Sequence, residues 1–308
     1  AATPGAGGQA AWHMLLGGDG AYVAPRPGTP PMLFAAAQFG ALVRFEAGDR
    51  KPVPIQPRSP QAYEPYRFNW LSPLLVSMPP AREILFGANM VLRSIDNGSS
   101  WEEISPDLSE RRNVAGSTPF ATVTALAESG PRPGHLYAGT DDGNVWLKAG
   151  SGSPWQKISQ VLPKKWVSRI VASSHQAGKV YVAMNGSREN DFQAYLFSSE
   201  NSGLDWESLS GRLPAEPLNA LAEDADPAVG RVKEFISLVF GNAALHDLNG
   251  NGRIVNNQYF QFFHPGPFRK PEKDDRRQGA GERRVALVVQ LGRHLGGDVQ
   301  AQQPEIPD

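Results

Sequence analysis

The stretch Ser94-Ile95-Asp96-Asn97-Gly98-Ser99-Ser100-Trp101 decides how this chain folds, because related stretches occur twice more. The second copy runs from Lys148 to Trp155, and the third runs from Ser199 to Trp206. The three tryptophans are separated by 54 and 51 residues. Each tryptophan is followed by a similar short segment that ends in Ser, at residues 102–105, 156–159 and 207–210. This regular spacing indicates an internal repeat of one structural unit.

The first copy matches the Asp-box pattern S-x-D-x-G-x-x-W through Ser94, Asp96, Gly98 and Trp101. In such a motif an Asp or Asn side chain binds backbone N–H groups of a tight turn, Gly supplies a positive φ, and Trp packs between neighbouring sheets. We therefore assign a structural role to all three copies. Each copy is expected to close the hairpin between the third and fourth strands of its unit.

The other two copies keep most of these structural residues. In the third copy Asn201 replaces the Asp and can make the same turn bonds. The second copy has Lys148 and Gly150 in place of Ser and Asp, so it is degenerate. The retained positions are Gly152, Trp155, Ser199, Asn201, Gly203 and Trp206.

Short β-forming runs precede each tryptophan in the same order, separated by turns rich in Pro, Gly and Asp. Such runs form antiparallel hairpins, and a four-stranded unit of about 50 residues repeated without helices is typical of a propeller blade. The sequence therefore predicts an all-β fold, a β-propeller of four-stranded antiparallel blades with Asp-box hairpins, either incomplete or divergent in its C-terminal part. The predicted blades cover residues 12–57, 68–108, 120–162 and 167–213, and a fifth begins at 218–223.

The amino-acid composition limits the classes of partner that we expect for this chain. The 308 residues carry 30 basic and 31 acidic side chains, so the net charge of −1 provides no field that would attract nucleic acid. The absence of Cys excludes disulfides, a thiol nucleophile and Cys-ligated zinc. No apolar run approaches the roughly 18 residues that span a bilayer. We therefore expect a chain that neither binds nucleic acid nor spans a membrane.

The repeats resemble the sortilin-type, bacterial-neuraminidase-repeat propellers of bacterial exported proteins. The resemblance covers about residues 12–224 and implies a periplasmic or extracellular propeller. It also implies that eukaryotic relatives bind peptides and that distant relatives include xyloglucanases and sialidases. The residues that carry it are Gly17–Val23, Arg67–Leu74, Leu92–Ser94 with Ile104–Leu108, and Leu136–Trp146.

The repeat pattern stops after Asp224, where neither a further Asp-box nor its preceding strand follows. We divide the chain accordingly into a linker left after processing, the propeller blades, a divergent final blade or extension, and a low-complexity tail. These parts cover residues 1–11, 12–224, 225–267 and 268–308.

One candidate metal site lies in the divergent part. Asp247, Asn249 and Asn251 place oxygen-bearing side chains at alternate positions before a Gly, as in the first half of a calcium loop. The twelfth position is Gln258 instead of the usual bidentate carboxylate. A simple Asn-Gly turn is the alternative. Calcium is the one cofactor that the sequence suggests.

A candidate ligand groove lies between the first two blades, where Tyr66, Arg67 and Trp70 cluster in a Pro-rich linker. In the alternative interpretation Phe68 and Trp70 begin a strand and pack inward. Several carboxylates near strand ends could face a groove, but hairpin turns and equivalent repeat positions account for them as structural residues. They are Asp19, Glu128, Asp141, Asp142 and Glu223.

These observations favour a non-catalytic, extracytoplasmic scaffold that binds a protein, peptide or glycan. A glycoside hydrolase of xyloglucanase or sialidase type is the alternative, and it requires two carboxylates that flank the scissile bond. A second alternative is an accessory or assembly subunit of a larger complex. No residue is assigned a catalytic role.

Overall fold

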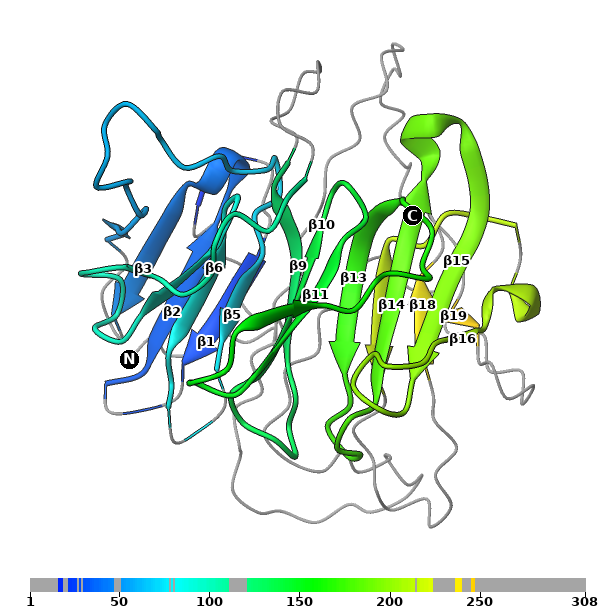
Figure 1. Cartoon of the computed structure of the whole chain (residues 1–308). Helices are drawn as coiled ribbons and strands as arrows, with labels where there is room; N and C mark the ends of the chain where they lie inside the picture. The colour runs from blue at the N-terminus through cyan, green and yellow to red at the C-terminus, as the bar shows by residue number, and fades with distance from the viewer. Residues whose placement is uncertain are drawn as a thin grey trace, which may run out of the picture.

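The described part of the chain forms five antiparallel β-sheets, which confirms the predicted all-β class (Figure 1). Four sheets contain four strands and one contains three. The architecture comes from a computed structural model, which describes residues 16–18, 22–26, 28, 30–46, 51–77, 79, 81–110, 121–213, 215–223, 236–239 and 245–246. No helix in these described ranges is both long enough and apolar enough to cross a membrane.

Each sheet is a simple meander, and we call the sheets blades 1 to 5 in chain order. Blade 1 contains β1 (Tyr22–Arg26), β2 (Met32–Ala36), β3 (Leu42–Glu46) and β4 (Val53–Pro54). Blade 2 contains β5 (Leu74–Val76), β6 (Ile84–Gly87), β7 (Val91–Ser94) and β8 (Glu102–Glu103). Blade 3 contains β9 (Val123–Glu128), β10 (His135–Thr140), β11 (Val145–Ala149) and β12 (Trp155–Lys157).

Blade 4 contains β13 (Trp166–Ala172), β14 (Val180–Gly186), β15 (Asp191–Ser199) and β16 (Glu207–Ser208). Blade 5 contains β17 (Ala220–Glu223), β18 (Ile236–Val239) and β19 (Leu245–His246). Three short 3-10 helices occur in connections: η1 (Gln38–Gly40), η2 (Ser187–Glu189) and η3 (Ser210–Arg212).

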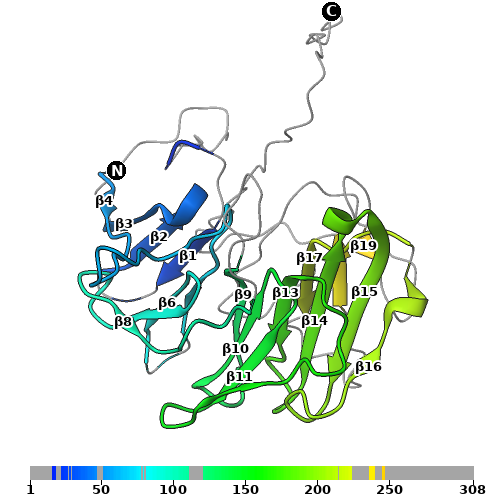
Figure 2. The ribbon, with the colours of Figure 1, turned by 45° about the horizontal axis from the view of Figure 1, so that its top comes forward.

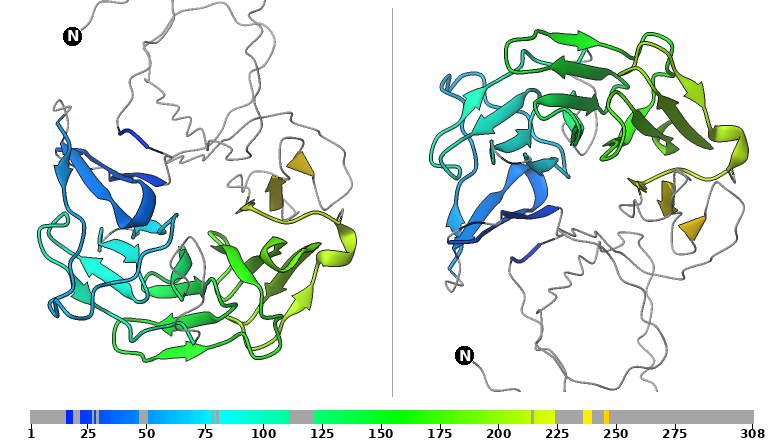
Figure 3. Two further views of the ribbon diagram at one scale, coloured as in Figure 1. Left: turned by 90° about the horizontal axis from the view of Figure 1, so that it is seen from above. Right: turned by 90° about the horizontal axis from the view of Figure 1, so that it is seen from below.

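The blades follow an arc around a common axis (Figures 2 and 3). The first strand of each blade lies closest to that axis, since β1 contacts β5, β9 contacts β13, and β13 contacts β17. The fourth strands lie at the periphery. Because the strands alternate in direction, the turns between second and third strands share one end of the blades with the connections from blade to blade. We call this end the upper face, and it is uppermost in Figure 1.

Apolar layers between neighbouring blades form the core. Phe34, Phe68 and Phe86 pack between blades 1 and 2, and Tyr137, Val167 and Val182 pack between blades 3 and 4. Burial of these side chains between facing sheets is the main source of stability, at roughly 25 cal/mol per Å² of apolar surface. Each blade thus depends on its neighbours, as expected for a repeat fold.

The three tryptophan hairpins lie between the third and fourth strands of blades 2, 3 and 4, as predicted. The linker of residues 65–73 contains no strand. Phe68 is buried in the core, whereas Trp70 is exposed, so only part of the inward-packing alternative holds.

Candidate functional site

Each hairpin tryptophan ties its blade to the preceding blade through one hydrogen bond. The indole N–H donates to the main-chain carbonyl oxygen of an isoleucine in the preceding blade. The acceptors of the second and third bonds both stand three residues after the preceding tryptophan, so one contact is repeated around the arc. The Nε1–O distances are 3.0 Å for Trp101 to Ile55, 2.7 Å for Trp155 to Ile104 and 2.8 Å for Trp206 to Ile158.

The first and third hairpins share one turn structure. Ser94 Oγ accepts the N–H of Gly98 at 2.7 Å, and Ser199 Oγ accepts the N–H of Gly203 at 2.8 Å. Asp96 Oδ1 accepts the N–H of Ser100 at 2.8 Å, and the side-chain oxygen of Asn201 makes the equivalent bond at 2.9 Å. Asn201 therefore makes the turn bonds that the sequence predicts for it.

The second hairpin has a different turn. Positive φ values occur at Asn97 and Gly98 in the first hairpin and at Ser202 and Gly203 in the third, but at Gly150 in the second. Lys148 stands at the Ser position, and its ammonium donates to the carbonyl oxygen of Ser153 at 2.6 Å. The indole N–H of Trp155 still binds the preceding blade, whereas the tip of the second hairpin has a different backbone conformation.

Acid is expected to weaken the first hairpin through Asp96. Hydrogen bonds from the Ser100 side chain and backbone lower the pKa of Asp96 from 3.8 to about 2. Because the folded pKa lies below the unfolded one, ionised Asp96 stabilises the fold above about pH 4, and this stabilisation is lost as the pH falls through 2. Asn cannot titrate, so the stability difference between wild type and Asp96→Asn should shrink between pH 5 and pH 2 in urea unfolding. A difference that stays constant between pH 5 and pH 2 would contradict this.

Most exposed, large apolar side chains of the described residues lie on the upper face. They project from turns between second and third strands or from the connections between blades. They are Phe39, Tyr63, Trp70, Val161 and Phe192. Clusters of exposed aromatic side chains mark binding surfaces more often than isolated ones do.

Phe39 and Trp70 form the best-defined pair on this face. Their ring centroids lie 4.9 Å apart in an edge-to-face arrangement, and 42% of Phe39 and 37% of Trp70 is exposed. The Phe39 N–H donates to the carbonyl oxygen of Trp70 at 3.3 Å. Phe39 has φ 55° and ψ 38°, a left-handed conformation that is costly for a large side chain. The fold thus holds an aromatic ring at the surface in a strained turn.

A second aromatic group lies on the same face at blade 4. The Arg188 guanidinium stacks over the Trp166 ring at 3.7 Å from its centroid. Burial lowers the pKa of Arg188, while the negative charges of Asp141 and Glu189 act in the opposite direction. Below the surface, Asn69, which precedes Trp70, donates to Asp141 Oδ2 at 3.3 Å, and the charge of Asp141 acts on Arg188. The upper face therefore carries two aromatic groups, Phe39 with Trp70 and Trp166 with Arg188, which we call the aromatic row.

The carboxylates beneath this row are held by protein donors. Asp141 accepts the N–H of Thr122 at 2.9 Å and its hydroxyl at 3.0 Å, and burial raises the pKa of Asp141. Asp142 accepts the Glu110 N–H at 2.7 Å and the Asn144 side-chain amide at 2.9 Å. Both side chains are buried, so neither is presented to a ligand as a hydrolase mechanism requires.

An Arg–Tyr contact crosses the axis of the arc. Arg169 on β13 donates to the hydroxyl of Tyr22 on β1 at 2.5 Å, and its guanidinium lies 5.3 Å from the tyrosine ring centroid. The carboxylates on the first strands bind local turns instead. Glu128 accepts the N–H of Gly134, and Glu223 accepts from Ser174. The described first strands therefore present no pair of facing carboxylates.

The structure separates the residues of the predicted groove. Tyr66 donates its hydroxyl to Glu103 on β8 at 2.8 Å, and Arg67 forms an ion pair with Asp107 at 2.6 Å. Trp70 projects from the upper face beside Phe39. Sequence patterns alone did not point to Phe39, Trp166 or Arg188. The sequence does contain one indication for Phe39. It is an aromatic residue directly before Gly40, in a tight turn between two strands.

The candidate calcium ligands Asp247, Asn249 and Asn251 lie outside the described residues, as do Asp19, the predicted linker 1–11 and the predicted tail 268–308. Within the part of the chain that is described, no group of three or more His, Asp or Glu side chains could hold a metal ion. The calcium site stays a prediction.

No protein-family model and no curated protein sequence matches this chain. Among solved structures, an ancestral GH74 enzyme is similar, with a TM-score of 0.55, 16% identity, and coverage of 77% of this chain and 32% of that one. Others are YCF48 bound to D1 peptide (TM-score 0.45, 16% identity, 73% and 65% covered) and Saccharomyces cerevisiae Sqt1 (TM-score 0.46, 11% identity, 68% and 52% covered). The chain spans about a third of the GH74 enzyme, and this likeness establishes the β-propeller fold alone.

Proposed function

We propose that this chain is a non-catalytic β-propeller scaffold that binds a protein, peptide or glycan partner on its upper face. The observation that carries the proposal is the exposed Phe39 and Trp70 pair, held in place by a strained backbone. A left-handed turn costs free energy when it carries a large side chain, and 42% of Phe39 is nevertheless exposed, so a role in binding explains this turn best.

The chemistry of the row suits an extended ligand. Phe39 and Trp70 offer aromatic edges and faces on which peptide side chains or sugar rings stack. Arg188, stacked on Trp166, adds a positive charge to this face, which favours a ligand that carries carboxylate groups. Preformed aromatic and arginine positions lower the entropy that is lost on binding.

We also propose that the chain is an Asp-box propeller of the sortilin and bacterial-neuraminidase-repeat type and that it acts outside the cytoplasm. The supporting features are the three recurring hairpins and the shared turn bonds of Ser94 with Asp96 and of Ser199 with Asn201. The location follows from the resemblance alone. Fractionation of the native cells after an epitope tag has been added to the chromosomal gene tests it, and a cytosolic tag would contradict it.

The binding test uses Phe39→Gly together with Trp70→Ala. Glycine adopts a left-handed turn without strain, so the strain that Phe39→Gly relieves offsets the packing that is lost with the ring. We therefore expect the free energy of unfolding to change by less than about 1 kcal/mol. We expect the double variant to lose about tenfold or more in affinity for peptides selected by wild type from a random library, or for soluble xyloglucan. Ile95→Ala, which removes an exposed apolar side chain at the opposite end, should leave affinity unchanged.

The same assay separates the alternatives. Unchanged affinity in the double variant would remove the upper face as the binding site. Release of reducing sugar from xyloglucan by the wild-type chain would favour a hydrolase. Co-purification of the wild-type chain with one complex at fixed stoichiometry would indicate an accessory subunit.

A further inference from the structure

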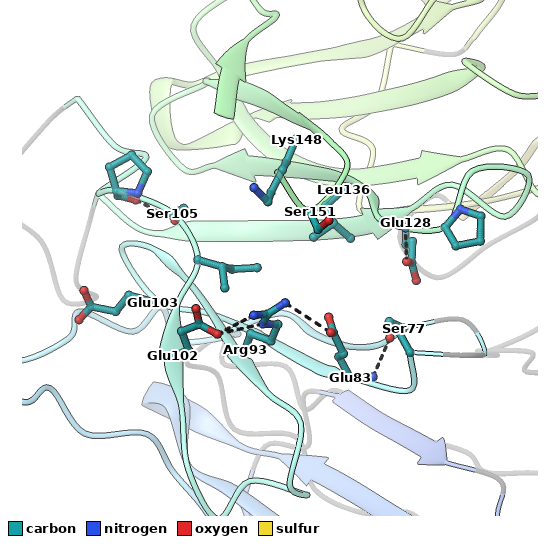
Figure 4. A pocket seen from close by; sticks show the side chains of 15 residues that line it. Ser77, Glu83, Arg93, Glu102, Glu103, Ser105, Glu128, Leu136, Lys148 and Ser151 are labelled. Carbon is teal, nitrogen blue, oxygen red and sulfur yellow. Dashed lines mark hydrogen bonds and ion pairs between the residues drawn. The ribbon is translucent and has the colours of Figure 1, made fainter. Parts of the chain in front are cut away.

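A cavity of about 590 Å³ opens between blades 2 and 3, away from the upper face (Figure 4). Its walls come from β7, β8 and the segment after β8 on one side. On the other side they come from the turn between β9 and β10 and from the second tryptophan hairpin. Pockets of this size commonly hold small ligands or single side chains.

The cavity exists because the second hairpin does not pack as the other two do. A Cβ added to Gly98 would lie 2.5 Å from the Ile55 side chain, and one added to Gly203 would lie 2.4 Å from the Ile158 side chain. The same construction at Gly152 meets no atom within 4 Å. Ile104, the isoleucine that the second hairpin would otherwise cover, lines the cavity instead.

The lining has an excess of negative charge. It contains Glu83, Glu102, Glu103 and Glu128 against the two cations Arg93 and Lys148. Arg93 Nη2 lies 2.6 Å from Glu102 Oε2, and Arg93 Nη1 lies 3.4 Å from Glu83 Oε1. Figure 4 shows Arg93 between these two carboxylates. Because these bonds use one oxygen each, the other carboxylate oxygens can accept hydrogen bonds from a ligand.

We propose that this cavity binds the arginine or lysine side chain of an extended peptide segment. The aliphatic stem of the guest would lie against Ile104 and Leu136, and its charged head would meet Glu83 and Glu102. The lining contains no aromatic ring on which a sugar could stack. The site is separate from the upper face and does not depend on the function proposed for that face.

The test uses a tetra-arginine peptide as the probe and tetra-citrulline as an uncharged peptide of the same shape. Because the chain has no Cys, Ser151→Cys supplies a single thiol at the cavity for an environment-sensitive fluorophore. We expect saturable binding of tetra-arginine that weakens with salt and no response to tetra-citrulline. The same fluorophore on Leu204→Cys, in the third hairpin, should report nothing.

Two variants decide the proposal. Glu83→Gln with Glu102→Gln should weaken tetra-arginine binding about tenfold, while Glu207→Gln, at the position of blade 4 that corresponds to Glu102, should leave it unchanged. Lys148→Ser with Gly150→Asp restores the Ser and Asp of the motif and so rebuilds the hairpin. The rebuilt hairpin should pack on Ile104. This variant makes the region more negative, so attraction by charge alone predicts tighter binding, whereas closure of the cavity predicts a loss of about tenfold.

No saturable response in wild type, equal affinity in the Glu83 and Glu102 variant, or tighter binding by the rebuilt hairpin would each overturn the proposal. Phe39→Gly with Trp70→Ala should leave tetra-arginine binding intact, so failure at this cavity and failure at the upper face are distinguishable.

Discussion

Trp101→Ala is expected to lower the free energy of unfolding by about 3 kcal/mol. The half-buried indole packs against Phe86, with ring centroids 6.2 Å apart, and completes the apolar layer between blades 1 and 2. Its N–H also satisfies the Ile55 carbonyl at 3.0 Å. Removing the ring leaves a cavity and an unpaired carbonyl at the same point. Urea unfolding followed by circular dichroism measures the change.

Two controls separate the causes of that loss. Trp101→Phe keeps most of the packing and loses the hydrogen bond, so about 1 to 2 kcal/mol is expected. Trp70→Ala removes an exposed indole and should cost less than about 1 kcal/mol. Equal losses for Trp101→Ala and Trp70→Ala would show that the hairpin tryptophans do not hold the blades together.

Gly98→Ala should destabilise the chain by about 2 to 4 kcal/mol, whereas Gly152→Ala should change stability by less than about 0.5 kcal/mol. Gly98 has φ 83°, and a Cβ there would lie 2.5 Å from Ile55 Cδ1. Gly152 occupies the same position of its repeat but lies in open space. The first hairpin therefore has no room for an Ala side chain, whereas the second hairpin accommodates it.

The midpoints of urea unfolding for the two variants, measured beside Gly203→Ala, check this. Gly203 has φ 91° and a Cβ there would approach Ile158 to 2.4 Å, so Gly203→Ala should resemble Gly98→Ala. A Gly152→Ala variant as unstable as the other two would mean that the second hairpin also packs on its preceding blade. It would also remove the physical basis of the inter-blade cavity.

The strand order and the position of the hairpins were predictable because both depend on local chemistry. Alternating apolar residues define strands, and the Ser, Asp or Asn, and Gly of the motif define a turn within eight residues. The recurring Ser after each tryptophan also has a local cause. Ser105, Ser159 and Ser210 each accept, through the side-chain hydroxyl, the N–H of a third-strand residue 14 positions earlier.

The sites were less predictable because they join distant segments. Phe39 and Trp70 are 31 residues apart and meet only when blade 1 packs beside its linker. The proposed groove of Tyr66, Arg67 and Trp70 assumed that neighbours in sequence share a surface, but each of these side chains binds a different partner. Strand spacing carries no information about such partners.

The sequence by itself determined that this chain is all-β, that its blades have four strands, and that three tryptophans recur at one position of the blade. These properties arise from side-chain alternation and turn chemistry within a few residues. Only the tertiary structure decided that Phe39 stands exposed beside Trp70, that Asp141 and Asp142 are buried under protein donors, and that a degenerate hairpin leaves a cavity over Ile104. Those outcomes depend on how closely one blade packs on the next, and that distance is set by side chains roughly one repeat apart.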